Sequence, residues 1–445
     1  MKKGTKSLAL LIVLMMCIGL FSACSKGESK TDDSKGDAVK ISIWSTLAES
    51  QDPTSAHQRL VKWVEEYNAT NTDNIVVDFV GNKNDDAILT AVSSGSGPDI
   101  FMGYWNTTST WADRGALMDI TDYVNNDQNF DKDDFANVGW EQATYDNKIW
   151  GVPFIMNTTT LYYRADLLRE AGYSEPPATF EELKDMAIAL TKYDADGNIV
   201  QAGFIPDYPW MDTVCWSVMA GAQWIDENNK INFDSDAMKE SYQFQLDIYN
   251  ELGYDKITKF KEGFGTRDSA ENPLLKGKVA MMFYSELMLP SLVAYGSDVE
   301  WDVTSLPHGS SPDSVNETML TTNQWKISSK TKHADEAWKV LSRLTSKESY
   351  ASFAEGASKA GAFYSRKSAV EAVKAMDVNP AMIKIADTML AGTGRGFPNS
   401  AYVNEYLSAI SSQMSLIFSG DLSIDEASKE VVKIVQPLAD KHPIN

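Results

Sequence analysis

Cysteine is scarce in this sequence, since the 445 residues include only three, at positions 17, 24 and 215. Cys17 lies in an apolar N-terminal segment and Cys24 follows that segment, so Cys215 has no cysteine partner in the rest of the chain. A disulfide framework is therefore excluded as the basis of the fold. A chain of this length can instead bury enough apolar surface for two domains with hydrophobic cores.

Histidine is also scarce, and the four histidines form no H-E-x-x-H pair. The usual ligand set of a zinc hydrolase is therefore missing, and we predict no metal site. Residues 194–198 begin like an EF-hand loop, but the twelfth position from Asp194 is Ile205, which has no carboxylate. We interpret this run as a turn, with calcium binding as the alternative. A G-x-S-x-G nucleophile elbow is missing too, so we predict no catalytic residue and no cofactor.

Basic residues are outnumbered in this chain. Forty Lys and Arg stand against 62 Asp and Glu, which gives a formal net charge of −22. Such an acidic chain is unsuited to binding nucleic acid, and to binding an anionic membrane through a basic surface. The charge fits an exported protein that carries a neutral or cationic ligand.

Residues 1–23 have the pattern of a secretory signal peptide: lysines at the start, an apolar stretch over 8–21 and two small residues before Cys24. The ending Phe-Ser-Ala-Cys resembles a bacterial lipobox, although Phe21 stands where Leu is usual. An ordinary secreted protein is the alternative. Residues 24–38 are polar, so we expect a lipidated Cys24 followed by a flexible tether. The chain would then be held at the extracellular face of the cell membrane by its lipid alone.

Residues 39–102 alternate between strand and helix patterns. The runs 39–44, 75–80 and 100–102 are apolar or alternating, and helical spacing of apolar residues lies between them. This order predicts a mostly parallel, layered α/β domain. A second α/β pattern follows the β-prone stretch 156–163. Capping boxes that start at Thr179 and Ser423 predict the first residues of two later helices.

Aromatic and polar residues follow the predicted strand ends. The strand at 100–102 is followed by Tyr104, Trp105 and Asn106. Because ligands of open α/β sheets bind outside the carboxyl ends of the strands, we interpret this exit as one wall of a binding site. A place for Trp105 in the core is the alternative, because Trp is usually well buried.

Several segments, taken in order, resemble the extracellular solute-binding proteins of bacterial ABC importers, specifically the sugar-type family. The matching segments are residues 39–44, 94–120, 148–154, 159–172, 177–183, 277–282 and 334–344. The resemblance implies an α/β fold of the periplasmic-binding-protein type, with two lobes, a ligand cleft between them and hinge crossovers.

The same resemblance suggests how the chain divides between the lobes. Lobe 1 would comprise residues 39–155 and 305–361, and lobe 2 residues 156–304 and 362–445. The hinge would lie near Asn157, Leu306 and Gly361, and Gly361 suits a hinge because glycine is conformationally permissive.

The resemblance also implies which residues line the cleft. They are Trp44, Glu49, Tyr104, Trp105, Asn106, Asn157, Trp210, Asp212, Tyr284, Glu286, Trp325 and Arg395. Aromatic planes beside amides and carboxylates suit a sugar, which has apolar faces and many hydroxyls. Thr321-Thr322 stands where many relatives have a Gly pair, so the resemblance implies that the backbone approaches the ligand less closely here.

The function implied is the substrate-binding subunit of an ABC importer, lipid-anchored and monomeric, which is not an enzyme. It would capture a carbohydrate, expected to be an oligosaccharide, and deliver it to the permease subunits. One alternative is an exported glycoside hydrolase, which needs two carboxylates about 5–10 Å apart. The other is an adhesin or sensor lipoprotein that binds sugar without transport.

Overall fold

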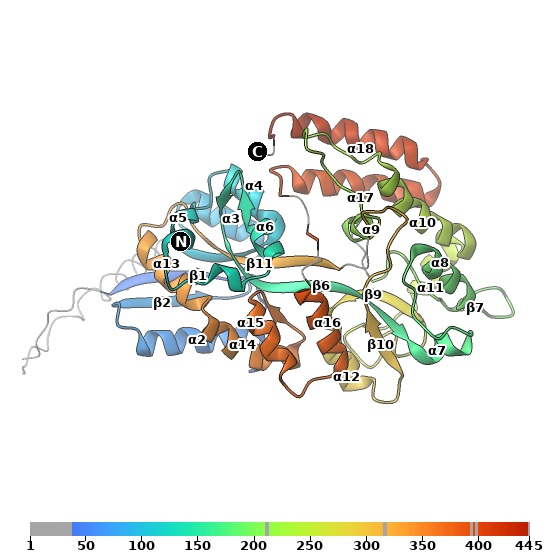
Figure 1. Cartoon of the computed structure of the whole chain (residues 1–445), viewed down its shortest axis with the longest axis horizontal. Helices are drawn as coiled ribbons and strands as arrows, with labels where there is room; N and C mark the ends of the chain where they lie inside the picture. Colours follow the sequence, from blue (N-terminus) through green and yellow to red (C-terminus); the bar gives the residue numbers. More distant parts are fainter. Residues whose placement is uncertain (1–37, 210–212, 315–317, 392–394, 397–398, 444–445) are drawn as a thin grey trace, which may run out of the picture. The chain divides into compact units, whose positions relative to one another are not determined.

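A single long strand, β6 (Val152–Arg164), is the centre of the main sheet (Figure 1). The computed structural model describes residues 38–209, 213–314, 318–391, 395–396 and 399–443. The signal segment, Cys24 and the tether before residue 38 lie outside the described residues, as do Trp210 and Asp212.

The main sheet has the strand order β10-β6-β11-β3-β1-β2, and β9 and β12 also pair with β6. Its other strands are β1 (Val39–Trp44), β2 (Ile75–Val80), β3 (Ile100–Tyr104), β9 (Met281–Ser285), β10 (Trp301–Thr304), β11 (Met319–Ile327) and β12 (Phe363–Tyr364).

The first part of the sheet is parallel, because β1 pairs in parallel with both β2 and β3. The connections are α2 (Ala56–Thr70), which Ser55 caps, and α3 (Asp85–Ser94), which Asn84 caps. Gly95 ends α3 with a φ of 75°, which glycine adopts without steric cost. The predicted strand-helix-strand-helix-strand order is thus confirmed.

Successive parts of β6 pair with different strands. Its first residues pair antiparallel with β11 and β12, whereas residues 159–163 pair with β9 and 161–164 with β10. One continuous backbone therefore belongs to the part of the sheet that holds β11 and to the part that holds β9 and β10.

Short helices and a hairpin complete the chain before β6. They are η1 (Trp105–Thr107), α4 (Thr108–Asp113), α5 (Thr121–Asn126), η2 (Lys132–Asp134), α6 (Asn137–Ala143), β4 (Thr144–Tyr145) and β5 (Lys148–Ile149). The turn between β4 and β5 has Asp146 and Asn147 at φ of 52° and 57°, the left-handed region that Asp and Asn tolerate.

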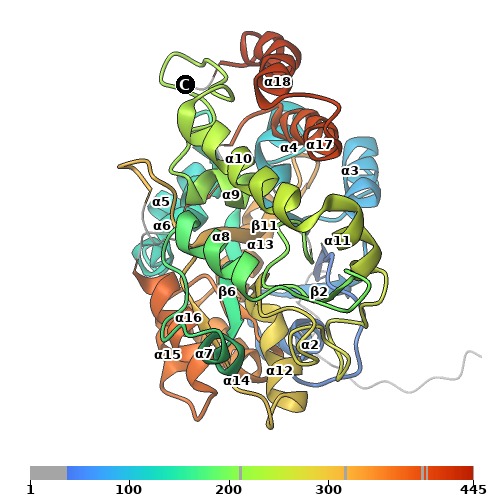
Figure 2. The ribbon, with the colours of Figure 1, turned by 90° about the vertical axis from the view of Figure 1, so that its right-hand side faces the viewer.

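The chain after β6 is largely helical (Figure 2). Its elements are α7 (Ala165–Glu170), α8 (Phe180–Ala189), β7 (Lys192–Tyr193), β8 (Ile199–Gln201), α9 (Thr213–Met219), α10 (Asp236–Leu252), α11 (Tyr254–Lys261), η3 (Glu286–Met288) and α12 (Leu289–Tyr295). Fully buried Trp216 packs against Phe180, Phe204, Phe244 and Phe283, so α8, α9 and α10 share a core with β9.

Six helices follow β11. They are α13 (Ala334–Leu344), α14 (Lys347–Ala360), α15 (Lys367–Lys374), α16 (Pro380–Leu390), α17 (Val403–Ser419) and α18 (Ile424–Ala439). The capping boxes predicted at Thr179 and Ser423 are confirmed at the starts of α8 and α18.

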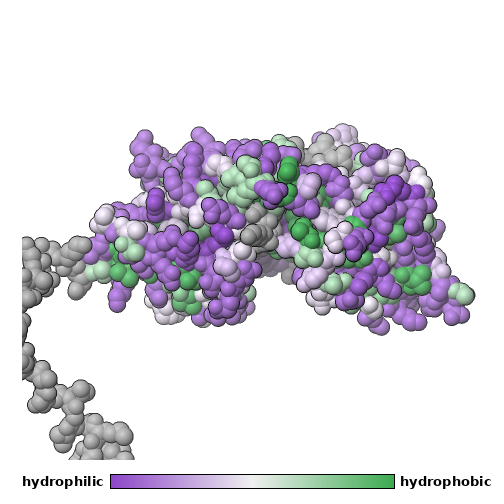
Figure 3. All heavy atoms as spheres, turned by 90° about the horizontal axis from the view of Figure 1, so that it is seen from below, coloured by the Kyte–Doolittle hydropathy of each residue, from purple (hydrophilic) through white to green (hydrophobic). Residues whose placement is uncertain are grey.

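The face seen in Figure 3 is mostly hydrophilic with scattered hydrophobic patches. Among the residues that the structure describes, no helix combines the length and apolar character needed to cross a membrane.

Arg366 is a fully buried cation just before α15. Its Nε donates to the Thr345 carbonyl at 2.7 Å, and its Nη1 donates to the Asp131 carbonyl at 2.9 Å and to Asp134 Oδ2 at 3.2 Å. The guanidinium also lies 4.1 Å from the centroid of the Phe135 ring. This cation therefore joins α15 to the segment at 131–135 and to the end of α13.

Replacing Arg366 with Met should lower the free energy of unfolding by about 3–5 kcal/mol, because the Asp134 carboxylate loses its cation and keeps only its bonds from Ser368. Urea denaturation measures the loss. Arg169→Met is the matched control, since Arg169 and Glu300 pair on the surface with 54% and 64% of their side chains exposed. That variant should lose less than about 1 kcal/mol. Equal losses would contradict the role given to Arg366.

Candidate functional site

The exit of β3 carries the first residues of the candidate site. Tyr104 ends the strand, and its hydroxyl donates to Thr321 Oγ1 of β11 at 2.7 Å. Trp105 is only 3% exposed, with its ring centroid 5.9 Å from that of Tyr104. Asn106 is half-buried, and its Nδ2 donates to Asn404 Oδ1 of α17 at 2.8 Å. The predicted exit residues thus divide between a buried ring and two polar side chains.

Asn157 lies where β6 and β11 run side by side. Asn157 is directly opposite Thr321, and Asn323 is directly opposite Tyr104 on β3. The Asn157 Nδ2 donates to Asn323 Oδ1 at 3.4 Å. We call Tyr104, Asn157, Thr321 and Asn323 the Asn157 cluster. All but Thr321 keep part of their surface accessible, so the cluster presents amides and a phenol that a ligand can reach.

A buried network of polar side chains lies beside the Asn157 cluster. Gln142 Oε1 accepts from the backbone nitrogen and the hydroxyl of Thr322, each at 2.9 Å. Thr108 donates to Gln324 Oε1 at 2.7 Å, and Gln324 donates to Thr322 at 3.2 Å. These four side chains of α4, α6 and β11 are fully buried and hydrogen-bonded to one another. Thr322 is therefore hydrogen-bonded to Gln142 of α6, and Gln324 is hydrogen-bonded to Thr108 of α4. These bonds fix β11 beside the Asn157 cluster.

Lys326 of β11 holds the turn at the β3 exit. It is fully buried, and its Nζ donates to Thr107 Oγ1 at 2.7 Å and to the Tyr104 carbonyl at 3.1 Å. A Cβ at Gly103 would lie 3.1 Å from this Nζ and 2.7 Å from Thr107 Oγ1, so glycine is needed there. Burial lowers the pKa of Lys326 to about 7, while the Asp85 carboxylate acts in the opposite direction. Sequence reasoning missed Lys326 because a lysine in a strand gives no sign of burial.

Glu286 lies at the end of β9, where η3 begins. Its side chain is fully buried, and Oε2 accepts from the backbone nitrogen of Thr158 at 2.8 Å. Oε1 is buried without a hydrogen-bond partner. Burial raises the pKa of Glu286 to about 8, although the bond from Thr158 lowers it. Glu286 is thus next to the Asn157 cluster along β6 but has no surface that a ligand could touch in this structure.

Tyr284 is 6% exposed, and the guanidinium of Arg267 lies 4.8 Å from its ring centroid. The ring of half-buried Tyr208 packs on Phe264 at 4.8 Å, and burial raises the pKa of Tyr208 to about 12 while Arg267 lowers it. Sequence reasoning missed Arg267 and Tyr208. A signal for Tyr208 was present, because it lies in the Pro-containing loop that directed attention to Trp210.

Four predicted residues remain, of which Trp325 lies on β11 and Arg395 bridges to its first residue. Half-buried Trp44 has Lys83 Nζ 5.0 Å from its ring centroid, and Glu49 is exposed. Trp325 is fully buried, and its ring packs against Phe154 at 5.2 Å. Half-buried Arg395 donates through Nη2 to the Asp313 carbonyl at 3.0 Å and forms a β-bridge with Met319 at the start of β11. The structure therefore assigns Trp325 to the core and brings Arg395 to β11.

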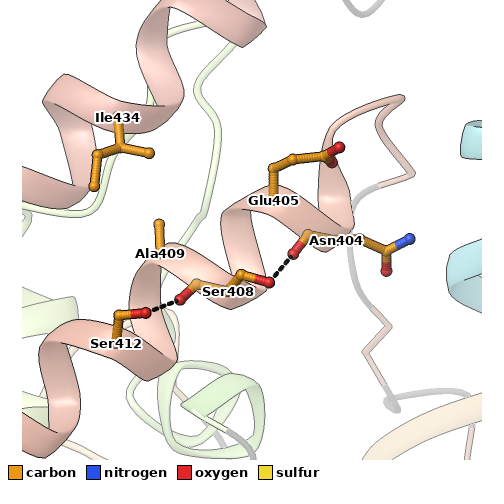
Figure 4. A pocket seen from close by; sticks show the side chains of 6 residues that line it. All are labelled: Asn404, Glu405, Ser408, Ala409, Ser412 and Ile434. Carbon is orange, nitrogen blue, oxygen red and sulfur yellow. Dashed lines mark hydrogen bonds between the residues drawn. The ribbon is translucent and has the colours of Figure 1, made fainter.

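A groove of about 460 Å³ runs between α17 and α18 (Figure 4). It is lined by Asn404, Glu405, Ser408, Ala409, Ser412 and Ile434. The hydroxyls of Ser408 and Ser412 donate to carbonyls one turn earlier at 2.8 Å, so the helix itself engages them. Among the described residues, no three His, Cys, Asp or Glu side chains are grouped so that they could hold a metal ion.

Replacing Lys326 with Met should change the pH dependence of stability. The folded pKa of about 7 lies below the ordinary 10.5, so the unfolded chain binds more protons between these values. The stability contributed by Lys326 therefore rises with pH in this window and is lost as the pH falls through it. Between pH 7 and 9 the parent should gain about 2 kcal/mol relative to the variant in urea denaturation. Exposed Lys330, replaced with Met, is the control, and identical profiles for the parent and Lys326→Met would refute the prediction.

Comparison with known proteins gives a family match and relatives of low identity. The pattern of the family described as bacterial extracellular solute-binding protein matches residues 52–351. A binding protein of Brucella abortus is 22% identical over 270 residues, which cover 60% of this chain and 63% of the relative. A maltotriose-binding protein of Pyrococcus abyssi is 22% identical over 62% of this chain and 55% of its own length. The chain thus spans less than two thirds of the length of these curated relatives.

Solved structures show the same fold. The sugar-binding protein MalE of Xanthomonas citri matches with a TM-score of 0.74 and 17% identity, covering 91% of this chain and 98% of that one. The structure of CpMnBP1 with mannobiose bound matches with a TM-score of 0.72 and 22% identity, covering 89% and 99%. The expected two-lobe α/β fold of the periplasmic-binding-protein type is confirmed. With the family pattern matching well over half of its length, the chain belongs to the bacterial extracellular solute-binding proteins.

Proposed function

We propose that this chain is the substrate-binding subunit of an ABC importer, and that it captures a carbohydrate for delivery to permease subunits. The observation that carries the proposal is the Asn157 cluster, where three strands bring two amides and a phenol together. The names of the maltotriose-binding and mannobiose-bound relatives support a sugar ligand.

The chemistry of the Asn157 cluster suits a neutral, hydroxyl-rich ligand. Each amide of Asn157 and Asn323 offers both a donor and an acceptor, and the Tyr104 hydroxyl offers both as well. A sugar hydroxyl also donates and accepts, so it can bind to either kind of group. The fully buried Glu286 adds no ligand-facing charge here.

The mechanism we propose is closure of two lobes that share β6. In this division, residues 39–155 and 305–361 form one lobe, and 156–304 and 362–445 form the other. Hinges near Asn157, Leu306 and Gly361 would lie on the connecting segments, and Gly361 has a φ of 71°. A ligand that contacts both lobes favours the closed state through its greater affinity for it, which gives the permease a signal of loading.

A role in binding is favoured over one in hydrolysis by the state of the carboxylates near the Asn157 cluster. A glycoside hydrolase needs an acid and a second carboxylate, both open to the substrate. Glu286 is fully buried at the start of η3, whereas Glu49 is exposed in the loop after β1. We propose that the chain acts as a monomer without an enzymatic activity of its own.

A sugar screen by isothermal titration calorimetry tests the proposal, with mannobiose, maltotriose and lactose as the first ligands. The parent should bind at least one sugar, and Asn157→Ala and Tyr104→Phe should each weaken it about 5–10-fold, because each removes one hydrogen-bonding group. Asn228→Ala, at an exposed turn position, should bind as the parent does. No binding of any saccharide, or unchanged binding by both site variants, would contradict the proposal.

We also propose that lipid at Cys24 anchors the protein at the extracellular face of the cell membrane. The basic and apolar residues before Cys24 support this anchoring. In cell fractionation, the parent should stay with the membrane, and Cys24→Ser should appear in the medium, since the acceptor of the lipid is gone. Release of both forms to the same extent would show that Cys24 carries no anchor.

A further inference from the structure

The buried side chain of Glu286 is hydrogen-bonded to the backbone of β6 beside Asn157. Thr158 follows Asn157, and its backbone nitrogen donates to Glu286 Oε2 at 2.8 Å. The Thr158 hydroxyl binds that of Thr318, which also donates to the Thr159 carbonyl. Thr318 directly precedes β11, so β6, η3 and the start of β11 are tied together at Thr158.

The segment between α14 and β12 packs on the same point. A Cβ at Gly361 would lie 2.6 Å from the Glu286 carbonyl oxygen and 2.9 Å from Pro290 Cδ of α12. β12 then pairs with β6 at Met156, one residue before Asn157. The backbone of Glu286 therefore packs against Gly361, and its side chain binds the residue after Asn157, so Glu286 contacts two of the three positions that we propose as hinges.

The carboxyl of Glu286 is incompletely partnered for a charged group. Its side chain is 0% exposed, Oε2 has the Thr158 nitrogen as donor, and Oε1 has no hydrogen-bond partner. A buried carboxylate is costly even with backbone bonds from Thr158 and from Glu286 itself, whereas a neutral acid in the same position leaves its bond with Thr158 intact. The raised pKa of Glu286 agrees with the neutral form.

Among the described residues, the titratable groups near Glu286 bring no positive charge into direct contact with its carboxyl. Tyr162 of β6 donates to the Ser285 carbonyl at 3.0 Å, and burial together with Glu286 raises its pKa. Tyr284 of β9 comes two residues before Glu286 in the sequence. The guanidinium of Arg267 lies 4.8 Å from the centroid of the Tyr284 ring. Because burial raises the pKa of Tyr162, this phenol is neutral near pH 7 and adds no charge beside Glu286.

We propose that Glu286 is a positioning residue, which as a neutral acid fixes the β6 backbone at Thr158, holds Asn157 in its binding position, and releases this hold when it ionises. The part of this inference that concerns ligand binding by Asn157 rests on the proposed function, whereas the hold of Glu286 on Thr158 does not. Ionisation would require water to enter between η3 and β6, and this would loosen the strand that carries the Asn157 cluster.

The first test is the pH dependence of stability without ligand, for the parent and Glu286→Gln. In the folded protein the pKa of Glu286 is about 8, above the ordinary value of 4.5. The stability that neutral Glu286 contributes is therefore fully present below about pH 4.5 and is lost as the pH rises through 8. Between pH 6 and 9, the equilibrium constant for folding of the parent should fall roughly 10–100-fold relative to that of the variant. Lys326 acts in the opposite direction, but both proteins contain it, so its effect cancels in the comparison.

The second test is the pH profile of binding, measured with the sugar found by calorimetry. The Kd of the parent should rise at least several-fold from pH 6 to 9, while Glu286→Gln should show a flat profile, which a purely structural role would not produce. Exposed Glu227, replaced with Gln, is the control and should follow the parent. Glu286→Asp, whose shorter side chain cannot span to Thr158, should weaken binding at both pH values.

Parallel stability profiles of the parent and Glu286→Gln would overturn the inference, whether or not a sugar ligand has been found. Parallel Kd profiles would overturn it too, because Asn157 would then not depend on Glu286. Failure to bind any sugar, with stability profiles that diverge as expected, would instead contradict the proposed function and support the neutral state of Glu286. The two proposals can therefore fail separately.

Discussion

The continuous hydrogen bonding of β6 is the constraint on which the rest of this structure depends. The strand pairs with β11 and β12 at its start and with β9 and β10 at its end, so the same backbone is shared by both parts of the sheet. Asn157 pairs with Thr321 of β11, two residues before the pairing with β9 begins at Thr159. A change in the pairing at either end of β6 is therefore expected to move the backbone at Asn157, where we expect the ligand to bind.

The polar groups around Asn157 divide into those that are open and those that are satisfied internally. Asn157 and Asn323 keep accessible surface, whereas Gln142, Gln324 and Lys326 are fully buried, and Lys326 holds the turn after β3. Buried networks of this kind are rigid when every group is paired. The open groups are thus presented from a fixed support, which reduces the entropy lost when a ligand binds.

Sequence patterns predicted the layered α/β order, the capping boxes and the polar exit of β3, because these depend on local spacing and on short-range bonds. They could not separate Trp325, which is in the core, from aromatics at the site, since both look alike in an alternating strand. The burial of Glu286 and Lys326 was equally hidden, because charged residues are assumed to be solvated unless the tertiary structure encloses them. What was missed therefore arises from contacts distant in sequence.

The most direct test of this account is a crystal structure of the protein with a bound sugar. The account predicts that the sugar contacts the amides of Asn157 and Asn323 and the hydroxyl of Tyr104, with Glu286 still bonded to the backbone of Thr158. A sugar bound instead in the groove between α17 and α18, with no contact to the Asn157 cluster, would contradict it.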